Sequence, residues 1–231
     1  MTARTGPSTA RREPLTRERV LRAAVDLADR EGIDALSMRR LGQELGVEAM
    51  SLYNHVGGKE DLLDGMVDAI IAEIEPAPET DGWKGAARAR ILSARRTMLR
   101  HPWASAVITT RTQASPMIMR YMDGMAGILR RGGFSVDLLH HAFHALGSRV
   151  LGFSQELFDD SSAPAADAMG AAMLQEMAAE YPYITQIVQQ VVHDEASVVG
   201  TGCDDGWEFE FALDLLLDGL ERLRDAAPDP A

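Results

Sequence analysis

Residues 36–63 read LSMRRLGQELGVEAMSLYNHVGGKEDLL, and the order of apolar and turn-forming residues in this stretch decides the fold. Residues 38–45 and residues 49–56 each carry apolar side chains at helical spacing. Gly46, between the two runs, can adopt the left-handed backbone that ends a helix. Ser37 is a favourable N-cap because its hydroxyl can accept a hydrogen bond from a free amide. The stretch predicts two short helices joined by a tight turn.

Each of these helices has one apolar face. Leu41 and Leu45 lie four residues apart in the first, and Leu52 and Val56 in the second, so each pair faces the interior. The other side chains of the second helix are small or carry hydrogen-bonding groups, and they leave little bulk to block a groove. Two short helices across a turn with glycine form a helix-turn-helix, whose second helix enters the major groove of DNA.

The composition suits one large domain or two smaller ones. The chain has 231 residues, of which 46% are hydrophobic and 6% aromatic. No run approaches the roughly 18 apolar residues of a membrane span, and the N-terminus lacks the apolar centre of a signal peptide. The single cysteine, Cys203, excludes an internal disulfide. We therefore expect a cytoplasmic protein.

The net charge of −12 is unevenly distributed along the chain. Residues 1–59 contain 10 Lys and Arg against 8 Asp and Glu, whereas residues 60–231 contain 13 against 27. A DNA-binding surface needs only one basic face of a small region, and an acidic remainder repels nonspecific DNA contacts. The charge pattern is therefore compatible with a DNA-binding N-terminal region.

The whole chain reads as helical, because no stretch shows sustained period-two alternation. Further helices are predicted over residues 17–31, 59–75, 83–100, 103–110, 116–131, 136–158, 166–180, 182–194 and 206–225. Thr16 is expected to cap the first of them. We expect an all-α fold in three parts. Residues 1–14 form a disordered arm, which is either a floppy tail or a basic segment that touches DNA. Residues 15–75 form a three-helix DNA-binding domain with a connector helix, and residues 76–231 a larger domain for ligand binding and dimerisation.

Two of the predicted helices are apolar over more than one face. In residues 206–225 a stripe at spacings of three and four is widened by Phe211 and Leu215, and residues 136–158 are similarly broad. A helix of that breadth needs cover on two sides. Two such helices from each of two chains would form a four-helix homodimer interface. The alternative is that both are interior helices of a monomer.

Over residues 36–63 and the helix before them, the sequence resembles the TetR family of bacterial transcriptional regulators, most closely the branch of the tetracycline repressor. The residues that carry the resemblance are Arg39, Leu41, Leu45, Gly46, Val47, Leu52, Tyr53, His55, Val56, Lys59, Leu62, Leu63 and Asp64. It covers residues 16–75 and again FEFALDLLLDGLERL (209–223), while the middle matches only in helical character. The resemblance implies a homodimer in which a bound small molecule changes the separation of two DNA-binding heads and releases DNA.

Ten residues are predicted to contact DNA. They are Ser37, Met38, Arg39, Ala49, Met50, Ser51, Tyr53, Asn54, His55 and Lys59. Arg39 can bind guanine bidentately, the hydroxyls and Lys59 suit phosphate oxygens, and Asn54 can read adenine. The resemblance leads us to expect polar Gln and Pro at the positions of Ala49 and Met50. The alanine and methionine side chains can touch a thymine methyl but cannot donate a hydrogen bond. The operator sequence is therefore not predicted. A solvated or packing role is the alternative for each.

Six residues are predicted to line a broad apolar effector pocket, since methionine and aromatic side chains suit such pockets. They are Trp103, Met117, Phe143, His144, Phe153 and Met173, with core filling as the alternative. His140, His141 and His144 form an HHxxxH cluster at a spacing that can hold a metal. No HExxH or CxxC partner accompanies the cluster. We therefore predict no metal site, no cofactor and no enzymatic activity.

Together these observations predict a ligand-responsive, homodimeric transcriptional regulator, and more specifically a repressor. Its partners would be a palindromic double-stranded operator and a small, largely apolar effector. Two alternatives from other classes stay open. One is a metal-binding or enzymatic helical protein with a vestigial DNA-binding head, which metal analysis would detect. The other is a protein–protein adaptor, which a size measurement would separate from a tight dimer.

Overall fold

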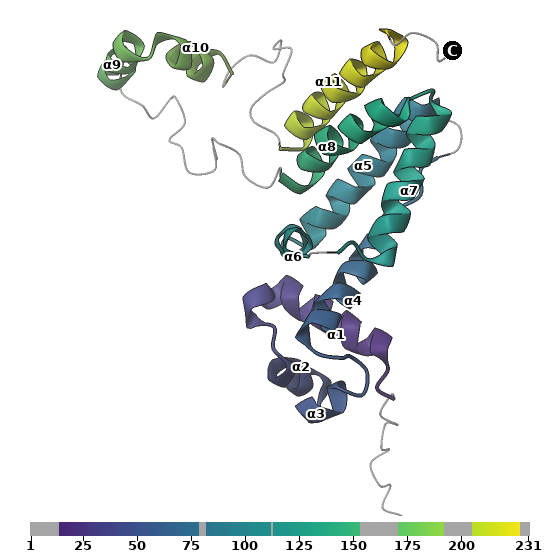
Figure 1. Cartoon of the computed structure of the whole chain (residues 1–231). Coiled ribbons are helices and arrows are strands. Elements are labelled where there is room, and N and C mark those ends of the chain that lie inside the picture. The colour runs from purple at the N-terminus through teal and green to yellow at the C-terminus, as the bar shows by residue number, and fades with distance from the viewer. Residues whose placement is uncertain (1–13, 79–81, 112, 153–170, 192–204, 227–231) are drawn as a thin grey trace, which may run out of the picture. The chain divides into compact units, whose positions relative to one another are not determined.

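A computed structural model describes residues 14–78, 82–111, 113–152, 171–191 and 205–226 (Figure 1). Its elements are α1 (Arg17–Glu31), the short 3₁₀ helix η1 (Ile33–Ala35), α2 (Met38–Leu45), α3 (Ala49–Leu52), α4 (Lys59–Ile71), α5 (Gly82–Arg100), α6 (Ala104–Thr110), α7 (Pro116–Arg131), α8 (Val136–Gly152), α9 (Ala171–Glu180), α10 (Pro182–Val191) and α11 (Asp205–Ala226). The described part of the chain contains no strand, and the all-α prediction is confirmed. None of the helices in these ranges has the length and apolar character needed to cross a membrane. The predicted arm lies almost wholly outside the described residues.

The chain divides into two compact units. The N-terminal unit contains the described residues up to Glu75 together with Arg96–Met122. The C-terminal unit contains Pro76–Arg95 and the described residues from Asp123 onward. Helices α5 and α7 therefore each contribute residues to both units.

The N-terminal unit is organised around the apolar faces of its first helices. Helix α1 packs on α2 and α4, and α2 packs on α3. Leu27, Leu41, Leu52, Leu62 and Met66 are fully buried and form the centre of this unit. Burying each such side chain contributes about 1.5–3 kcal/mol, so these contacts hold helices α1 to α4 together.

In the N-terminal unit, the helix ends that were predicted from capping residues and glycine are confirmed. The Thr16 hydroxyl caps α1 by accepting from the amide of Arg19 at 3.2 Å. The Ser37 hydroxyl caps α2 in the same way, accepting from the amide of Arg40 at 3.1 Å. Gly46 ends α2 in the left-handed conformation, with φ 66° and ψ 35°, which a residue with a side chain adopts only at a steric cost.

Two helices of the N-terminal unit are shorter than predicted. Helix α3 ends at Leu52 instead of near residue 56, because the Leu52 carbonyl accepts from the amides of both His55 and Val56 and closes a tighter turn. Helix α4 ends at Ile71 instead of residue 75. Beyond it, the amides of residues 73 and 74 bond three residues back, and Pro76 prevents a helical continuation.

The C-terminal unit is built on the seam between α5 and α11. The ammonium of Lys84 lies 2.5 Å from Asp218 and 2.7 Å from Glu221. Arg88, one turn further along α5, lies 2.7 Å from both Asp214 and Glu210. Helix α8 packs on α11 in turn, and α9 packs on α10. The residues predicted to extend α8 to 158 and to begin a helix at 166 lie outside the described residues.

Candidate nucleic-acid interface

The close approach of α2 and α3 depends on a glycine inside α2. The carbonyl of Gly42 accepts from the amide of Val47 at 2.9 Å, which folds the turn against the helix. A Cβ at Gly42 would lie 2.9 Å from the Val47 carbonyl oxygen and 3.2 Å from the Ala49 nitrogen. Both neighbours are backbone atoms and cannot rotate away. No role was predicted for Gly42 from the sequence, although a glycine inside an apolar-periodic helix is a signal of close backbone approach.

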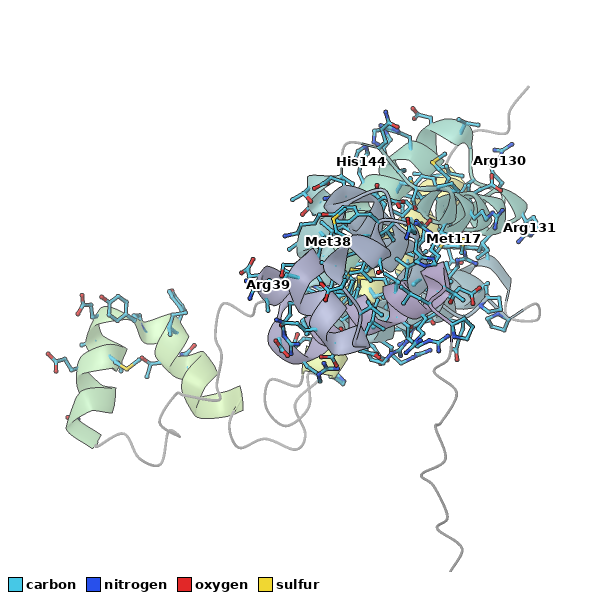
Figure 2. The ribbon with its side chains drawn as sticks, turned by 90° about the horizontal axis from the view of Figure 1, so that it is seen from below. Met38, Arg39, Met117, Arg130, Arg131 and His144 are labelled. Carbon is cyan, nitrogen blue, oxygen red and sulfur yellow. The ribbon has the colours of Figure 1, made fainter. Side chains whose placement is uncertain are left out.

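The outward face of this motif carries most of the residues predicted to contact DNA. Met50 is 74% exposed and Tyr53 is 47% exposed, and Arg39, Asn54 and Lys59 are also exposed. Ser37 is exposed as well, although its oxygen already caps α2. Partly exposed residues complete this face, namely Met38, Ala49, Ser51 and His55. Figure 2 views the N-terminal unit from this side, with Met38 and Arg39 labelled at the start of α2.

Two neighbouring arginines of α2 differ in their surroundings. The guanidinium of Arg40 lies 2.5 Å from Glu31 and 3.3 Å from Glu44, so its charge is committed within the protein. No carboxylate within the described ranges pairs with Arg39, and the same holds for Lys59 at the start of α4. These two cations are therefore available to phosphate or base edges.

The loop between α3 and α4 is fixed by one ion pair, which we call the α1–α4 clamp. Arg17 binds both oxygens of Asp61 at 2.7 Å and also donates to the carbonyl of His55 at 3.0 Å. Asp61 in addition accepts from the amide of Gly57 at 2.7 Å. The guanidinium of Arg17, helped by this amide, lowers the pKa of the Asp61 carboxyl from 3.8 to about 2. The clamp therefore positions the loop that carries Asn54 and His55 and leads into Lys59 at the start of α4.

The lowered pKa of Asp61 gives the clamp a predictable pH dependence. A depressed carboxyl pKa stabilises the fold above the unfolded value of 3.8, and this contribution is lost as the pH falls towards 2. Because both side chains of the pair are more than 40% exposed, we expect a contribution of only about 1 kcal/mol or less at neutral pH. Asp61→Asn should lower the urea midpoint at pH 7 and have a much smaller effect near pH 2.

The exposed Glu48→Gln is the matched control and should change neither midpoint. An equal loss for Asp61→Asn at both pH values would show that the charge of Asp61 is not what stabilises the loop.

A second polar network lies at the other end of α1. Both oxygens of Asp29 lie 2.9 Å from Nδ1 of His101, and Asp29 also accepts from Nε1 of Trp103 at 2.6 Å. Nε2 of His101 lies 3.3 Å from Glu73, just after α4. His101 and Trp103 are buried. This network joins α1 and the end of α4 to the segment that leads into α6, and sequence reasoning did not find it.

The residues predicted to line an effector pocket are not all placed by the structure. Trp103 and Met117 belong to the N-terminal unit, and Phe143 and His144 belong to the C-terminal unit. Phe153 and the side chain of Met173 lie outside the described residues. The pocket itself stays a prediction.

The histidine cluster is exposed on α8. The ring centroids of His140 and His144 are 4.7 Å apart, and those of His140 and His141 are 5.4 Å apart. Within the described ranges, no three His, Cys, Asp or Glu residues are arranged to hold a metal ion. The rings meet edge to face, with interplanar angles of 75° for His140 and His144 and 74° for His140 and His141.

Two sequence families match this chain. The pattern of "Bacterial regulatory proteins, tetR family" matches residues 20–66, which include α2, α3 and most of α4. The pattern of "Tetracyclin repressor-like, C-terminal domain" matches residues 75–224. The first match contains the motif described above, and the second covers most of the C-terminal unit together with Arg96–Met122 of the N-terminal unit.

Individual relatives agree with these families. The HTH-type transcriptional repressor DrrR1 of Streptomyces coeruleorubidus is 32% identical over 229 residues, which cover 94% of this chain and 81% of that repressor. An HTH-type transcriptional regulator of Saccharopolyspora erythraea is 36% identical over 139 residues, which are 60% of this chain but only 59% of that regulator. Among solved structures, the TetR family protein ActR of Streptomyces coelicolor, in complex with (S)-DNPA, is 30% identical with a TM-score of 0.70. The match covers 92% of this chain and 100% of that one.

Proposed function

Because the chain belongs to the TetR family of bacterial regulatory proteins, we propose that it is a ligand-responsive transcriptional repressor. In this proposal a homodimer binds a palindromic double-stranded operator, and a small molecule in the C-terminal unit releases it. The relatives named as repressors support this reading, and they do not support a metal-binding or enzymatic protein with a vestigial DNA-binding head.

One observation carries the proposal, namely the exposed face of α2 and α3. On it the cations of Arg39 and Lys59 have no carboxylate partner within the described ranges, and the slim helix α3 presents Met50 and Tyr53 outward. A guanidinium and an ammonium suit guanine and phosphate, and an exposed thioether suits the methyl of thymine. The exposed face of α2 and α3 thus combines side chains that can contact base edges with side chains that can bind the phosphate backbone.

Dimerisation is supported by apolar side chains that one chain leaves exposed on α8 and α11. They are Val136, Phe211, Leu215 and Leu223. A second copy of α8 and α11 would cover them and form the four-helix interface that the sequence predicts. Two heads joined in this way fit two half-sites about one DNA turn apart or somewhat more, ~34–36 Å or beyond.

An effector is supported by the similarity to ActR, which was solved in complex with a small molecule. The predicted pocket residues in the C-terminal unit are consistent with an effector that is largely apolar. On this proposal the effector favours a conformation in which the two heads no longer fit both half-sites, so its binding and that of DNA weaken each other reciprocally.

Binding of a labelled duplex to the purified protein at low salt, together with sedimentation analysis, tests the proposal. We expect saturable binding by a species with the mass of two chains, and release when the effector is added. A strictly monomeric protein would contradict the homodimer, and a protein that ignores duplex DNA would contradict the function.

Replacing Lys59 by alanine should weaken the binding of all duplex sequences to a similar degree. One lost phosphate contact lowers the slope of log affinity against log salt by about one. The measurement is a salt series by fluorescence anisotropy. Arg96→Ala is a matched control because Arg96 is paired with Glu75, and it should leave the slope unchanged. An unchanged slope for Lys59→Ala would remove Lys59 from the interface.

Replacing Arg39 by alanine should relax the preference for one base in each half-site. A bidentate contact to guanine contributes about 1–3 kcal/mol of discrimination, so the preference should fall by about tenfold or more. The neighbouring Arg40→Ala is the control, since Arg40 is held by Glu31 and Glu44 and should affect stability instead of base preference. Competition between duplexes that differ at single positions measures both, and a preference profile that stays intact in Arg39→Ala would overturn the assignment.

A further inference from the structure

His101 is a buried histidine whose two ring nitrogens both face carboxylates. It lies between α5 and α6 in the N-terminal unit, and it is only 7% exposed. Nδ1 lies 2.9 Å from both oxygens of Asp29 on α1, and Nε2 lies 3.3 Å from Oε2 of Glu73, just after α4. The backbone of His101 is fixed as well, because its amide donates to the carbonyl of Thr97 and its carbonyl accepts from the amide of Ala104. The ring is therefore held between two segments that are distant in the sequence.

The hydrogen-bonding capacity of imidazole makes this arrangement depend on a proton. A neutral ring has one N–H donor and one nitrogen that only accepts, whereas an imidazolium has two donors. An ionised carboxylate only accepts. A neutral ring of His101 can therefore donate to Asp29 or to Glu73 but not to both, and its other nitrogen then faces an oxygen with which it cannot bond. Only the imidazolium satisfies both contacts.

The charges around the ring also favour a second proton on it. Among the described residues, the hydrogen bonds and ion pairs at the ring involve Asp29, Glu73 and Arg100, whose Nη2 lies 2.7 Å from the same Oε2 of Glu73. Two carboxylates and one guanidinium leave one negative charge, which an imidazolium balances. Burial opposes ionisation of Glu73, but hydrogen bonds from Arg100 and His101 outweigh it and hold the pKa of the Glu73 carboxyl below its usual value. Glu73 is therefore ionised throughout the range, about pH 5 to 8, in which histidine titrates.

The two sides of the ring differ in their access to solvent. Asp29 is held by a second buried donor, since Nε1 of Trp103 lies 2.6 Å from its Oδ1. The side chain of Glu73 is 42% exposed, and it is also paired with Arg100. Water can therefore replace Nε2 as the partner of Glu73 and can carry the proton away. The contact with Asp29 has no such replacement, so the contact with Glu73 is the one that deprotonation breaks.

We propose that His101 is a proton-dependent latch between the end of α4 and the segment before α6. With both ring nitrogens protonated, the latch holds α1 and the end of α4 to this segment. As the pH rises through the range in which histidine titrates, the contact with Glu73 is lost and the end of α4 is freed, while α1 stays attached through Asp29. The N-terminal unit is therefore held together more tightly near pH 6 than near pH 8.5. The latch lies within one unit and depends on neither the effector nor the operator.

Nuclear magnetic resonance of the full chain with isotope-labelled histidines reports which ring nitrogens carry hydrogens. The signals of His101 are those that disappear in His101→Asn. Near pH 6 we expect both of its ring nitrogens to be protonated, and near pH 8.5 only Nδ1. A neutral ring near pH 6 would overturn the proposal, because burial would then have excluded the charge. A ring that keeps both hydrogens near pH 8.5 would also overturn it, since His101 would then be a permanent cation.

Hydrogen exchange at the end of α4 measures the latch itself. The amides of Glu73 and Ile74 each donate to a carbonyl three residues back, so their protection reports whether this turn is held. From about pH 6 to about pH 8.5 we expect their protection in the wild-type protein to fall at least about threefold, after correction for the intrinsic exchange rate.

Two variants should abolish this fall, and a third should keep it. In Glu73→Gln the side-chain amide can donate to a neutral Nε2, and in His101→Asn the amide nitrogen can donate to Asp29 but cannot titrate. His141→Asn is the matched control, because His141 is exposed on α8 in the other unit, and it should behave like the wild-type protein. If His101→Asn does not fold, Glu73→Gln alone decides. No fall in the wild-type protein, or an equal fall in Glu73→Gln, would overturn the proposal.

Discussion

Asp29→Ala is expected to lower the free energy of unfolding by about 2–4 kcal/mol. The substitution removes the acceptor for Nε1 of Trp103 and Nδ1 of His101, both of which are buried. A buried donor left without an acceptor costs about 1–3 kcal/mol, and here two donors lose theirs. Urea unfolding of the full chain at fixed protein concentration, followed by far-UV circular dichroism, measures the change.

Two variants control this prediction. Asp26→Ala removes an exposed carboxylate one turn earlier on α1 and should change the stability by less than about 0.5 kcal/mol. Asp29→Asn keeps one acceptor oxygen and should cost less than Asp29→Ala. If Asp29→Ala were as stable as Asp26→Ala, the network would contribute nothing, and the junction of α1, α4 and the segment before α6 would need another explanation.

Gly42→Ala is expected to destabilise the protein and to weaken operator binding by about tenfold or more, since α3 can no longer lie in its place. On helix propensity alone, alanine should stabilise α2 by about 1 kcal/mol. Against this, its Cβ would lie 2.9 Å from the carbonyl oxygen of Val47, a contact that only a backbone shift relieves. Overpacking of this kind costs about 1–3 kcal/mol, so we expect a net loss of about 1–2 kcal/mol.

The sign of the Gly42→Ala effect is therefore diagnostic, because propensity and packing predict opposite directions. Gln43→Ala is the neighbouring control on an exposed position of α2, and it should leave both stability and operator affinity nearly unchanged. Operator affinity is measured at a temperature at which Gly42→Ala remains folded by circular dichroism. A stabilised variant with normal affinity would contradict the close approach of α2 and α3.

Local features of this fold could be predicted from the sequence, because their causes lie within a few residues. Thr16 and Ser37 cap the helices that follow them, and Gly46 adopts the left-handed conformation that ends α2. The lengths of α3 and α4 were predicted less well. Their last turns tighten through hydrogen bonds to the third residue back. The spacing of apolar residues does not predict that change in hydrogen bonding.

The long-range polar contacts could not be predicted, because they pair residues distant in the sequence. Arg17 meets Asp61 across 44 positions, and Asp29 meets Trp103 across 74. In the sequence, each of these residues resembles an ordinary exposed or core side chain. Its hydrogen-bond partner is determined only by how the helices pack.

The residues on the outward face of α3 could be predicted from the sequence, but the extent to which each side chain is exposed could not. Small and polar residues were expected there, and the structure adds that Met50 protrudes most, at 74% exposure. A helix of four residues with one protruding thioether is a narrow probe of the groove. We therefore expect base preference to depend on a thymine methyl near Met50 as well as on the base that Arg39 contacts.

Selection of bound duplexes from a pool of random sequences, with the purified full chain at low salt, tests the central claim most directly. The claim is that two copies of the α2–α3 motif enter the major groove of one DNA molecule. We expect enrichment of an inverted repeat whose half-site centres are about one helical turn apart or somewhat more. A selected pool that stays as random as the starting pool, or a protein that binds none of it, would contradict the account.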